Sequence, residues 1–345
     1  FLKKKKLFSI DSDKKFMRQG DWSRPITHSS FFIDEKLVWM EKYNINHAVV
    51  LSLSQLYCNG WKKNNALDAI RFQNDFNASI QNDFSDKFTS GFVVQPLYIN
   101  DALKEIERCV NELGLKVLCL PTHFLSKSKK WLSVASKEVD PIFELANKYS
   151  LSIEIHPYNA DEMVNLEDKY WRFHLIWMMA QCADTFHIFT LRGLPNKYPN
   201  IRTCFAHGCM LSIANYGRRL QGYDGRPDLF KETENPRNFL SHKNIFFDTL
   251  VHDVYTLELM KKRVGVSQIV AGLDAELPEV IWRPDEGPVV HEEDFASSYG
   301  ASKPGGVETG GGPRGGHPPV RDAGRQRGGK SAPCRVRRHH NGGVP

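Results

Sequence analysis

Three kinds of pattern are missing from this chain of 345 residues, and each absence excludes a class of protein. No run of about 18 consecutive apolar residues occurs, so we expect no helix that crosses a membrane. Neither G-x-G-x-x-G nor G-x-x-x-x-G-K-[ST] is present, which argues against a glycine-rich phosphate-binding loop. The lysine-rich start, FLKKKKLF, is followed by no apolar stretch and is therefore a poor signal peptide.

Cysteines are few and scattered. None of the seven forms a C-x-x-C pair, and their odd number does not suit a closed disulfide framework. Scattered cysteines of this kind are typical of a protein whose thiols stay reduced, so we predict a cytoplasmic protein. The positions are Cys58, Cys109, Cys119, Cys182, Cys204, Cys209 and Cys334.

Charge and composition change near the end of the chain. The formal net charge is +6, but residues 301–345 alone hold nine Lys and Arg against two Asp and Glu. The same stretch contains twelve of the 25 glycines and six of the 18 prolines. Such a composition buries too little apolar surface to offset the entropy of ordering, so we predict a disordered tail over 281–345. The rest of the chain is nearly neutral and gives no sign of a nucleic-acid surface.

Helical and strand patterns alternate between these ends. Apolar residues at helical spacing predict helices, and short β-branched runs predict strands. Helices are expected over 34–44, 66–84, 101–113, 140–149, 170–191, 210–220 and 254–264. Strands are expected over 47–53, 91–95, 115–120, 151–156, 201–206, 244–249 and 267–272.

This alternation predicts an α/β fold of parallel strands joined by right-handed crossovers. An open doubly wound sheet and a closed (β/α)8 barrel both fit, but a doubly wound nucleotide binder needs the glycine-rich turn that is missing. We therefore predict a (β/α)8 TIM-like barrel over 31–280, preceded by a weakly structured segment over 1–30. A barrel needs one strand more than the pattern supplies, and we expect that strand to lie upstream of Phe1.

Three predicted strands end at side chains that suit a divalent metal ion. The stretch LSIEIHPY ends its strand at His156, because Pro157 cannot donate to a sheet. His207 follows the strand over 201–206, and Asp274 follows the strand over 267–272. A single such histidine is usually structural. Three polar residues at the same rim of a barrel predict a shared metal and catalytic site.

From Asn44 to about Asp274 the chain resembles the amidohydrolase-related barrel decarboxylases, the group of 2-amino-3-carboxymuconate 6-semialdehyde decarboxylase. The resemblance implies a metal-dependent, non-oxidative decarboxylase of an unsaturated or aromatic carboxylic acid. From the charge balance and the lack of long apolar runs we expect no nucleic-acid or membrane partner. The resemblance is carried, in family order, by GFVVQPLYINDALKEIERCVNELGLKVLCLPTH, EIHPY, YPNIRTCFAHG, GRPDL, NPRNFL, FFDTLVHD and GLD.

The resemblance also implies roles for particular residues. His156 and Asp274 resemble ligands of Zn²⁺ or another divalent ion such as Mn²⁺, with Asp274 also catalytic. His207 resembles the acid/base beside the metal. Arg226 of GRPD resembles an arginine that grips a substrate carboxylate in the neighbouring subunit, which implies a homodimer.

Two further residues are candidates for substrate contact. His123 follows LCLPT at the end of a predicted strand, and Trp177 lies in the predicted helix over 170–191. Core or rim packing is the alternative for the tryptophan.

The chain departs from the family pattern at two places. The family's first strand carries an H-x-H metal motif that this sequence lacks, since His28 is isolated and His47 precedes its strand. After Asp274 the sequence AELPEVIWRPDEG diverges, so we expect the last helices to be missing as well. Two alternatives therefore stay open, namely a hydrolase or hydratase on the same scaffold and an inactive barrel remnant.

Overall fold

The computed structural model of the protein describes residues 9–11, 16–19, 22–25, 28–158, 169–272, 281–283 and 287–289. All of these residues belong to one unit of the chain, Phe1–Gly300. The predicted tail over 281–345 lies outside the described residues, apart from an antiparallel pair formed by β13 (Ile281–Arg283) and β14 (Gly287–Val289). Its disorder therefore stays a prediction.

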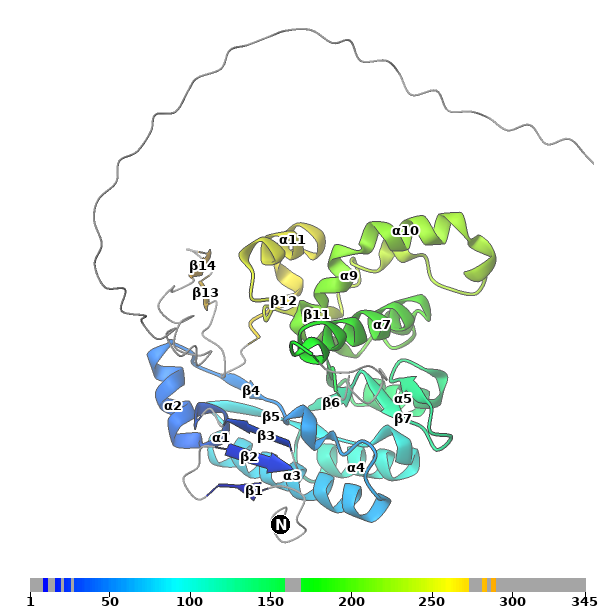
Figure 1. Ribbon diagram of the computed structural model, residues 1–345. Helices are drawn as coiled ribbons and strands as arrows, with labels where there is room; N and C mark the ends of the chain where they lie inside the picture. Colours follow the sequence, from blue (N-terminus) through cyan, green and yellow to red (C-terminus); the bar gives the residue numbers. More distant parts are fainter. Residues whose placement is uncertain are drawn as a thin grey trace, which may run out of the picture. The chain divides into compact units, whose positions relative to one another are not determined.

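A seven-stranded parallel sheet forms the centre of the fold, and its strands follow one another in sequence order (Figure 1). A doubly wound sheet reverses its strand order at one point, whereas a barrel adds each strand to the same edge. The order therefore confirms the barrel-type α/β prediction. The strands are β4 (Ala48–Val50), β5 (Phe88–Val93), β6 (Val117–Pro121), β9 (Ser152–His156), β10 (Arg202–Phe205), β11 (Ile245–Asp248) and β12 (Ile269–Val270).

Helices lie between successive strands, as the alternation predicted. Two of the predicted helices are divided. The stretch over 170–191 begins with a turn and a π-helix (Phe173–Trp177), and the stretch over 210–220 breaks at Asn215. None of the helices in the described ranges is long and apolar enough to cross a membrane. The α-helices are α1 (His28–Phe31), α2 (Ile33–Lys42), α3 (Lys63–Asp83), α4 (Ile99–Asn111), α5 (Asp140–Lys148), α7 (Met178–Leu191), α8 (Leu194–Lys197), α9 (Met210–Ala214), α10 (Tyr216–Gly225) and α11 (Val254–Val264).

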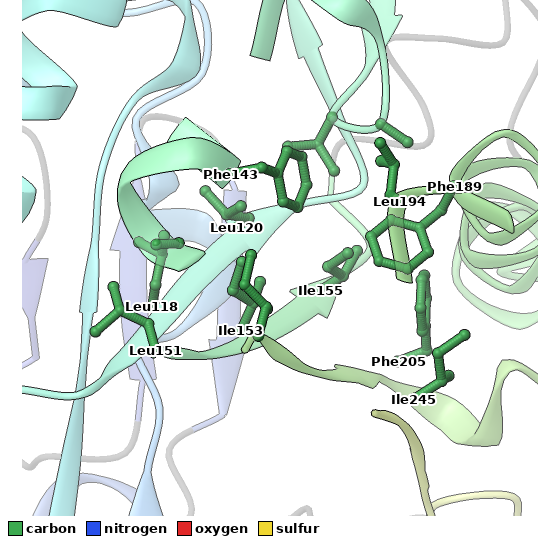
Figure 2. Packing of buried hydrophobic residues seen from close by; sticks show 14 of the residues in the cluster. Leu118, Leu120, Phe143, Leu151, Ile153, Ile155, Phe189, Leu194, Phe205 and Ile245 are labelled. Carbon is green, nitrogen blue, oxygen red and sulfur yellow. The ribbon is translucent and has the colours of Figure 1, made fainter. Parts of the chain in front are cut away.

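One face of the sheet packs against helices and holds the main core. Alternate side chains of the central strands, among them Leu118, Ile153 and Phe205, belong to this core together with Phe143 of α5 and Phe189 of α7 (Figure 2). Burying each of these large apolar side chains contributes roughly 1.5–3 kcal/mol of stability. The core therefore fixes which residues of each strand face the helices.

The intervening residues face the other side of the sheet, because side chains alternate along a strand. Hydrogen-bond register places Cys119 of β6 and Cys204 of β10 beside Glu154 of β9. Two residues further along the same face, His156 lies opposite Pro121. This face therefore carries Glu154, and His156 stands at its carboxyl rim.

The first residues that the structure describes form a small sheet that the sequence patterns did not predict. β1 (Ser9–Ile10), β2 (Phe16–Gln19) and β3 (Trp22–Pro25) pair in antiparallel order. Arg18 donates three hydrogen bonds to Asp11, from Nε to Oδ1 at 2.9 Å and to Oδ2 at 3.2 Å, and from Nη2 to Oδ2 at 2.9 Å. Strands of two to four residues are too short for an alternating pattern to be recognised.

Candidate active site

The carboxyl rim of the sheet brings two of the predicted site residues together. His156 is the last residue of β9, and His207 follows β10. The two imidazole rings lie 5.0 Å apart between centroids and are tilted by 60°. The backbone N–H of Ala206 donates to the Ile155 carbonyl at 3.1 Å, so the two strands stay paired up to the rim. A distance of this order allows both rings to act on one small group.

His207 is buried, with 9% of its surface exposed, and its Nε2 atom has no hydrogen-bond partner in the described part of the chain. Burial, followed by the neighbouring His174 and His252, lowers the pKa of this imidazole to about 4. The ring is therefore neutral at pH 7. A neutral imidazole with an unused nitrogen can accept a proton and return it.

An unusual backbone turn sets the direction of His207. His207, Gly208 and Cys209 have φ angles of 55°, 59° and 44°, so three consecutive residues adopt the left-handed conformation. The Asp248 carboxylate at the end of β11 accepts the backbone N–H groups of His207 at 3.0 Å and of Gly208 at 2.7 Å. Burial raises the pKa of Asp248, and these N–H groups oppose that effect because they stabilise its charged form.

Glu154 is a second carboxyl group on the same face of the sheet. Only 7% of its surface is exposed, and the Tyr57 hydroxyl donates to its Oε2 atom at 3.2 Å. Burial, followed by the negative charge of Asp248, raises the pKa of Glu154 to about 8. The side chain therefore holds its proton at neutral pH, which avoids an unpaired buried charge.

Segment 170–177 approaches the rim through His174, whose ring stacks on Trp171 at 4.1 Å. Trp177, predicted to touch substrate, is the last residue of the π-helix and is half-buried. Trp171 has 52% of its surface exposed, and Leu175 and Ile176 are exposed to a similar degree. The segment thus presents apolar side chains to solvent close to the two histidines.

The other predicted site residues are placed as follows. His123 in β7 (His123–Leu125) is buried, and its Nε2 atom lies 2.9 Å from Oδ2 of Asp184 on α7. Arg226 is exposed at the end of α10 and pairs with Asp228 at 2.9 Å and 2.7 Å. Asp274 lies outside the described residues. Their proposed roles in substrate or metal binding stay predictions.

The donor set for a metal ion is incomplete among the residues that the structure describes. No group of three His, Cys, Asp or Glu side chains within these ranges is arranged to hold one. The unpartnered Nε2 atom of His207, beside His156, is the feature that suits a metal centre with a neighbouring acid/base. We therefore assign no reaction step to the metal itself.

Glu154, Tyr57 and Asp248 were not predicted as site residues. Glu154 interrupts an apolar strand at the position that shares its face with His156, which is a recognisable signal. Asp248 is the penultimate residue of the predicted strand over 244–249, close to the carboxyl end that identified His156 in its own strand. Tyr57 gave no such signal, because it lies in a short 3-10 helix after β4 and meets Glu154 only through folding.

Comparison with known proteins agrees with this architecture. The sheet order is that of a TIM-type α/β barrel. Residues 64–293 match the sequence profile described as amidohydrolase, and this match spans more than half of the chain. The chain belongs to the amidohydrolase family, as the motifs predicted.

Individual relatives are named as decarboxylases. The 2-amino-3-carboxymuconate-6-semialdehyde decarboxylase of Dictyostelium discoideum is 26% identical over 269 residues, which cover 76% of this chain and 72% of that protein. The solved structure of 5-carboxyvanillate decarboxylase from Sphingomonas paucimobilis is 18% identical, with a TM-score of 0.60 over 70% of this chain and 71% of that chain.

A dihydroxybenzoic acid decarboxylase from a Polaromonas species was solved with bound manganese and the inhibitor 2-nitroresorcinol. It is 17% identical, with a TM-score of 0.59 over 69% of this chain and 74% of that chain. At such identities the likeness to both solved structures shows a shared fold.

Proposed function

We propose that this protein is a metal-dependent, non-oxidative decarboxylase of an unsaturated or aromatic carboxylic acid. The observation that carries the proposal is the buried, unpartnered Nε2 atom of His207 beside the ring of His156. Membership of the amidohydrolase family and the decarboxylase name of the Dictyostelium relative support it.

His207 moves the proton in this proposal. Its neutral ring takes a proton from solvent water at Nε2 and passes it to the substrate carbon that bears the carboxylate. The bond from this carbon to the carboxylate then breaks, its electron pair restores the conjugated system, and carbon dioxide leaves. A proton thus replaces carbon dioxide, and the reaction needs no oxidant.

His156 and Asp274 are proposed to hold a divalent ion, Zn²⁺ or Mn²⁺. Such an ion supplies Lewis acidity that polarises substrate oxygens. The manganese in the Polaromonas structure supports a divalent ion of this kind. Oxygen and imidazole donors suit either metal.

Substrate binding is proposed to involve Arg226, His123 and Trp177. Arg226 would leave its exposed pair with Asp228 and bind the substrate carboxylate of a neighbouring subunit in a homodimer. An exposed ion pair of this kind contributes little stability, so the exchange costs little. His123 and Trp177 would line the pocket.

The test is a product assay on the purified full chain supplied with Mn²⁺ or Zn²⁺. The substrates are 2-amino-3-carboxymuconate 6-semialdehyde, 5-carboxyvanillate and 2,6-dihydroxybenzoate. We expect one equivalent of carbon dioxide for each equivalent of one substrate consumed, without oxygen uptake. Mass spectrometry of the product identifies the loss of the carboxyl group.

The alternative on the same scaffold is a hydrolase or hydratase, because a fold does not fix its reaction. Substrate loss with addition of water and without carbon dioxide would favour that alternative. Absence of any conversion, with the metal retained after purification, would contradict the decarboxylase proposal.

A further inference from the structure

The turn that carries His207 adopts a conformation that its residues do not prefer. His207 and Cys209 are not glycine, yet both have φ angles in the left-handed region, at 55° and 44°. Side chains with a Cβ atom disfavour this region, and such backbones persist where the surroundings hold them. Gly208 between them is required, because a Cβ atom there would lie 2.5 Å from Cγ1 of Val251.

The Asp248 carboxylate holds the His207 turn in this conformation. One of its carboxylate oxygens lies 3.0 Å from the backbone nitrogen of His207 and the other lies 2.7 Å from that of Gly208. The backbone N–H of Leu250 donates to the second oxygen as well, at 3.1 Å. Hydrogen bonds to a charged acceptor are stronger than those between neutral groups, so this carboxylate ties the turn to the end of β11.

The same side chain also supports the strand that leads to Asp274. A Cβ atom on Gly272 would lie 2.5 Å from Cβ of Asp248 and 2.8 Å from its Cγ. The Gly272 N–H donates to Oγ1 of Thr249 at 3.1 Å, which holds the chain just after β12 in this close position. Asp248 therefore lies between the His207 turn and the segment that continues into Asp274.

We infer that Asp248 is a positioning residue, which aims the His207 imidazole at the centre beside His156 by clamping the backbone of the turn. The inference rests on the proposed function and adds to it a residue, Asp248, that has no part in the proton transfer or in metal and substrate binding. Asp248 itself acts through the backbone and not on the substrate. A misplacement of about 1 Å in such a group can cost 10²-fold in rate.

The test compares Asp248→Asn with Asp253→Asn. Asparagine keeps the shape but can accept only one of the two turn N–H groups, since its NH2 group is a donor. Asp253 is a matched control, because its carboxylate also accepts a backbone N–H, from Thr256 at 2.6 Å, at an exposed site. Two readouts are taken: kcat and KM for 2-amino-3-carboxymuconate 6-semialdehyde with Mn²⁺, and amide hydrogen exchange by NMR.

In Asp248→Asn we expect kcat to fall about 100-fold with KM within threefold of the wild type. Amide exchange should accelerate at His207 and Gly208. Asp253→Asn keeps an oxygen that can accept the single Thr256 N–H, so both the exchange at Thr256 and kcat should stay close to the wild type. If Asp248→Asn does not fold, Gly272→Ala displaces the carboxylate instead, and faster exchange at His207 and Gly208 is the expected result.

Two results would overturn the role of Asp248 without affecting the proposed function. A folded Asp248→Asn variant with wild-type kcat would do so, as would unchanged protection of the His207 and Gly208 amides. A wild-type protein that releases no carbon dioxide is a different outcome, which overturns the proposed function and the role of Asp248 with it.

Discussion

Glu154 shows how the fold accommodates a buried carboxyl group on the face of the sheet that carries the site. Glu154 lies between Ile153 and Ile155, which both belong to the core on the opposite face. Alternation along β9 turns its carboxyl group toward the polar face, where Tyr57 is its hydrogen-bond partner. A buried carboxyl group of this kind is tolerated because it stays protonated.

A pH dependence of stability follows from Glu154. Its pKa is about 8 in the folded chain, whereas the ordinary value is 4.5. Between these values the folded state keeps a proton that the unfolded state has lost, so stability falls as pH rises, by about 1.4 kcal/mol per pH unit. The measurement is the free energy of unfolding in urea with EDTA, taken between pH 5 and pH 8. The wild type should show this slope, and Glu154→Gln should lack it.

The control for this prediction is Glu112→Gln. Glu112 is an exposed carboxyl group at the end of α4, and its replacement should leave the slope unchanged. Equal slopes in the wild type and Glu154→Gln would show that Glu154 ionises normally in the folded chain.

Elements differ in how closely their sequence determines them. The predicted helix over 101–113 is found as α4, because its apolar face repeats at helical spacing. The stretch over 170–191 is mostly apolar and was predicted as one long helix, yet Tyr170 and Trp171 adopt left-handed φ angles and a π-helix follows. A π-helix has about one residue per turn more than an α-helix. Over a single turn this difference is too small to be recognised from the positions of apolar residues.

The rim turn after β10 allows a prediction at the scale of one element. Gly208 has a φ of 59°, and a Cβ atom there would lie 2.8 Å from Sδ of Met260 as well as close to Val251. Gly208→Ala therefore combines a left-handed alanine with overpacking against α11, at a cost of roughly 3 kcal/mol. The midpoint of urea unfolding measures this loss.

Gly222 in α10 is the matched control. A Cβ atom there meets nothing within 4 Å, and the residue lies inside a helix. Gly222→Ala should stabilise the chain slightly, by about 0.5–1 kcal/mol. An unchanged unfolding midpoint in Gly208→Ala would contradict the close packing of the turn against Val251 and Met260.

At the scale of the whole molecule, the order of elements was predictable and their contacts were not. Alternating helical and strand patterns were enough to predict a parallel sheet in sequence order, and strand ends identified His156 and His207 as rim residues. The hydrogen bond from His207 to Asp248, which holds the left-handed turn, joins residues 41 positions apart, so no local pattern predicts it. Asp274 lies outside the described residues, and its place beside the histidines stays a prediction.

The central claim is that His207 transfers the proton in a decarboxylation, and the carbon dioxide release rate of His207→Ala tests it most directly. The assay uses 2-amino-3-carboxymuconate 6-semialdehyde and saturating Mn²⁺. His47→Ala is the control, because His47 precedes β4 at the opposite end of the sheet and bonds Thr89 at 2.9 Å. We predict a rate about 10²–10⁴-fold below the wild type for His207→Ala and a wild-type rate for His47→Ala. Carbon dioxide release by His207→Ala at the wild-type rate would contradict the account.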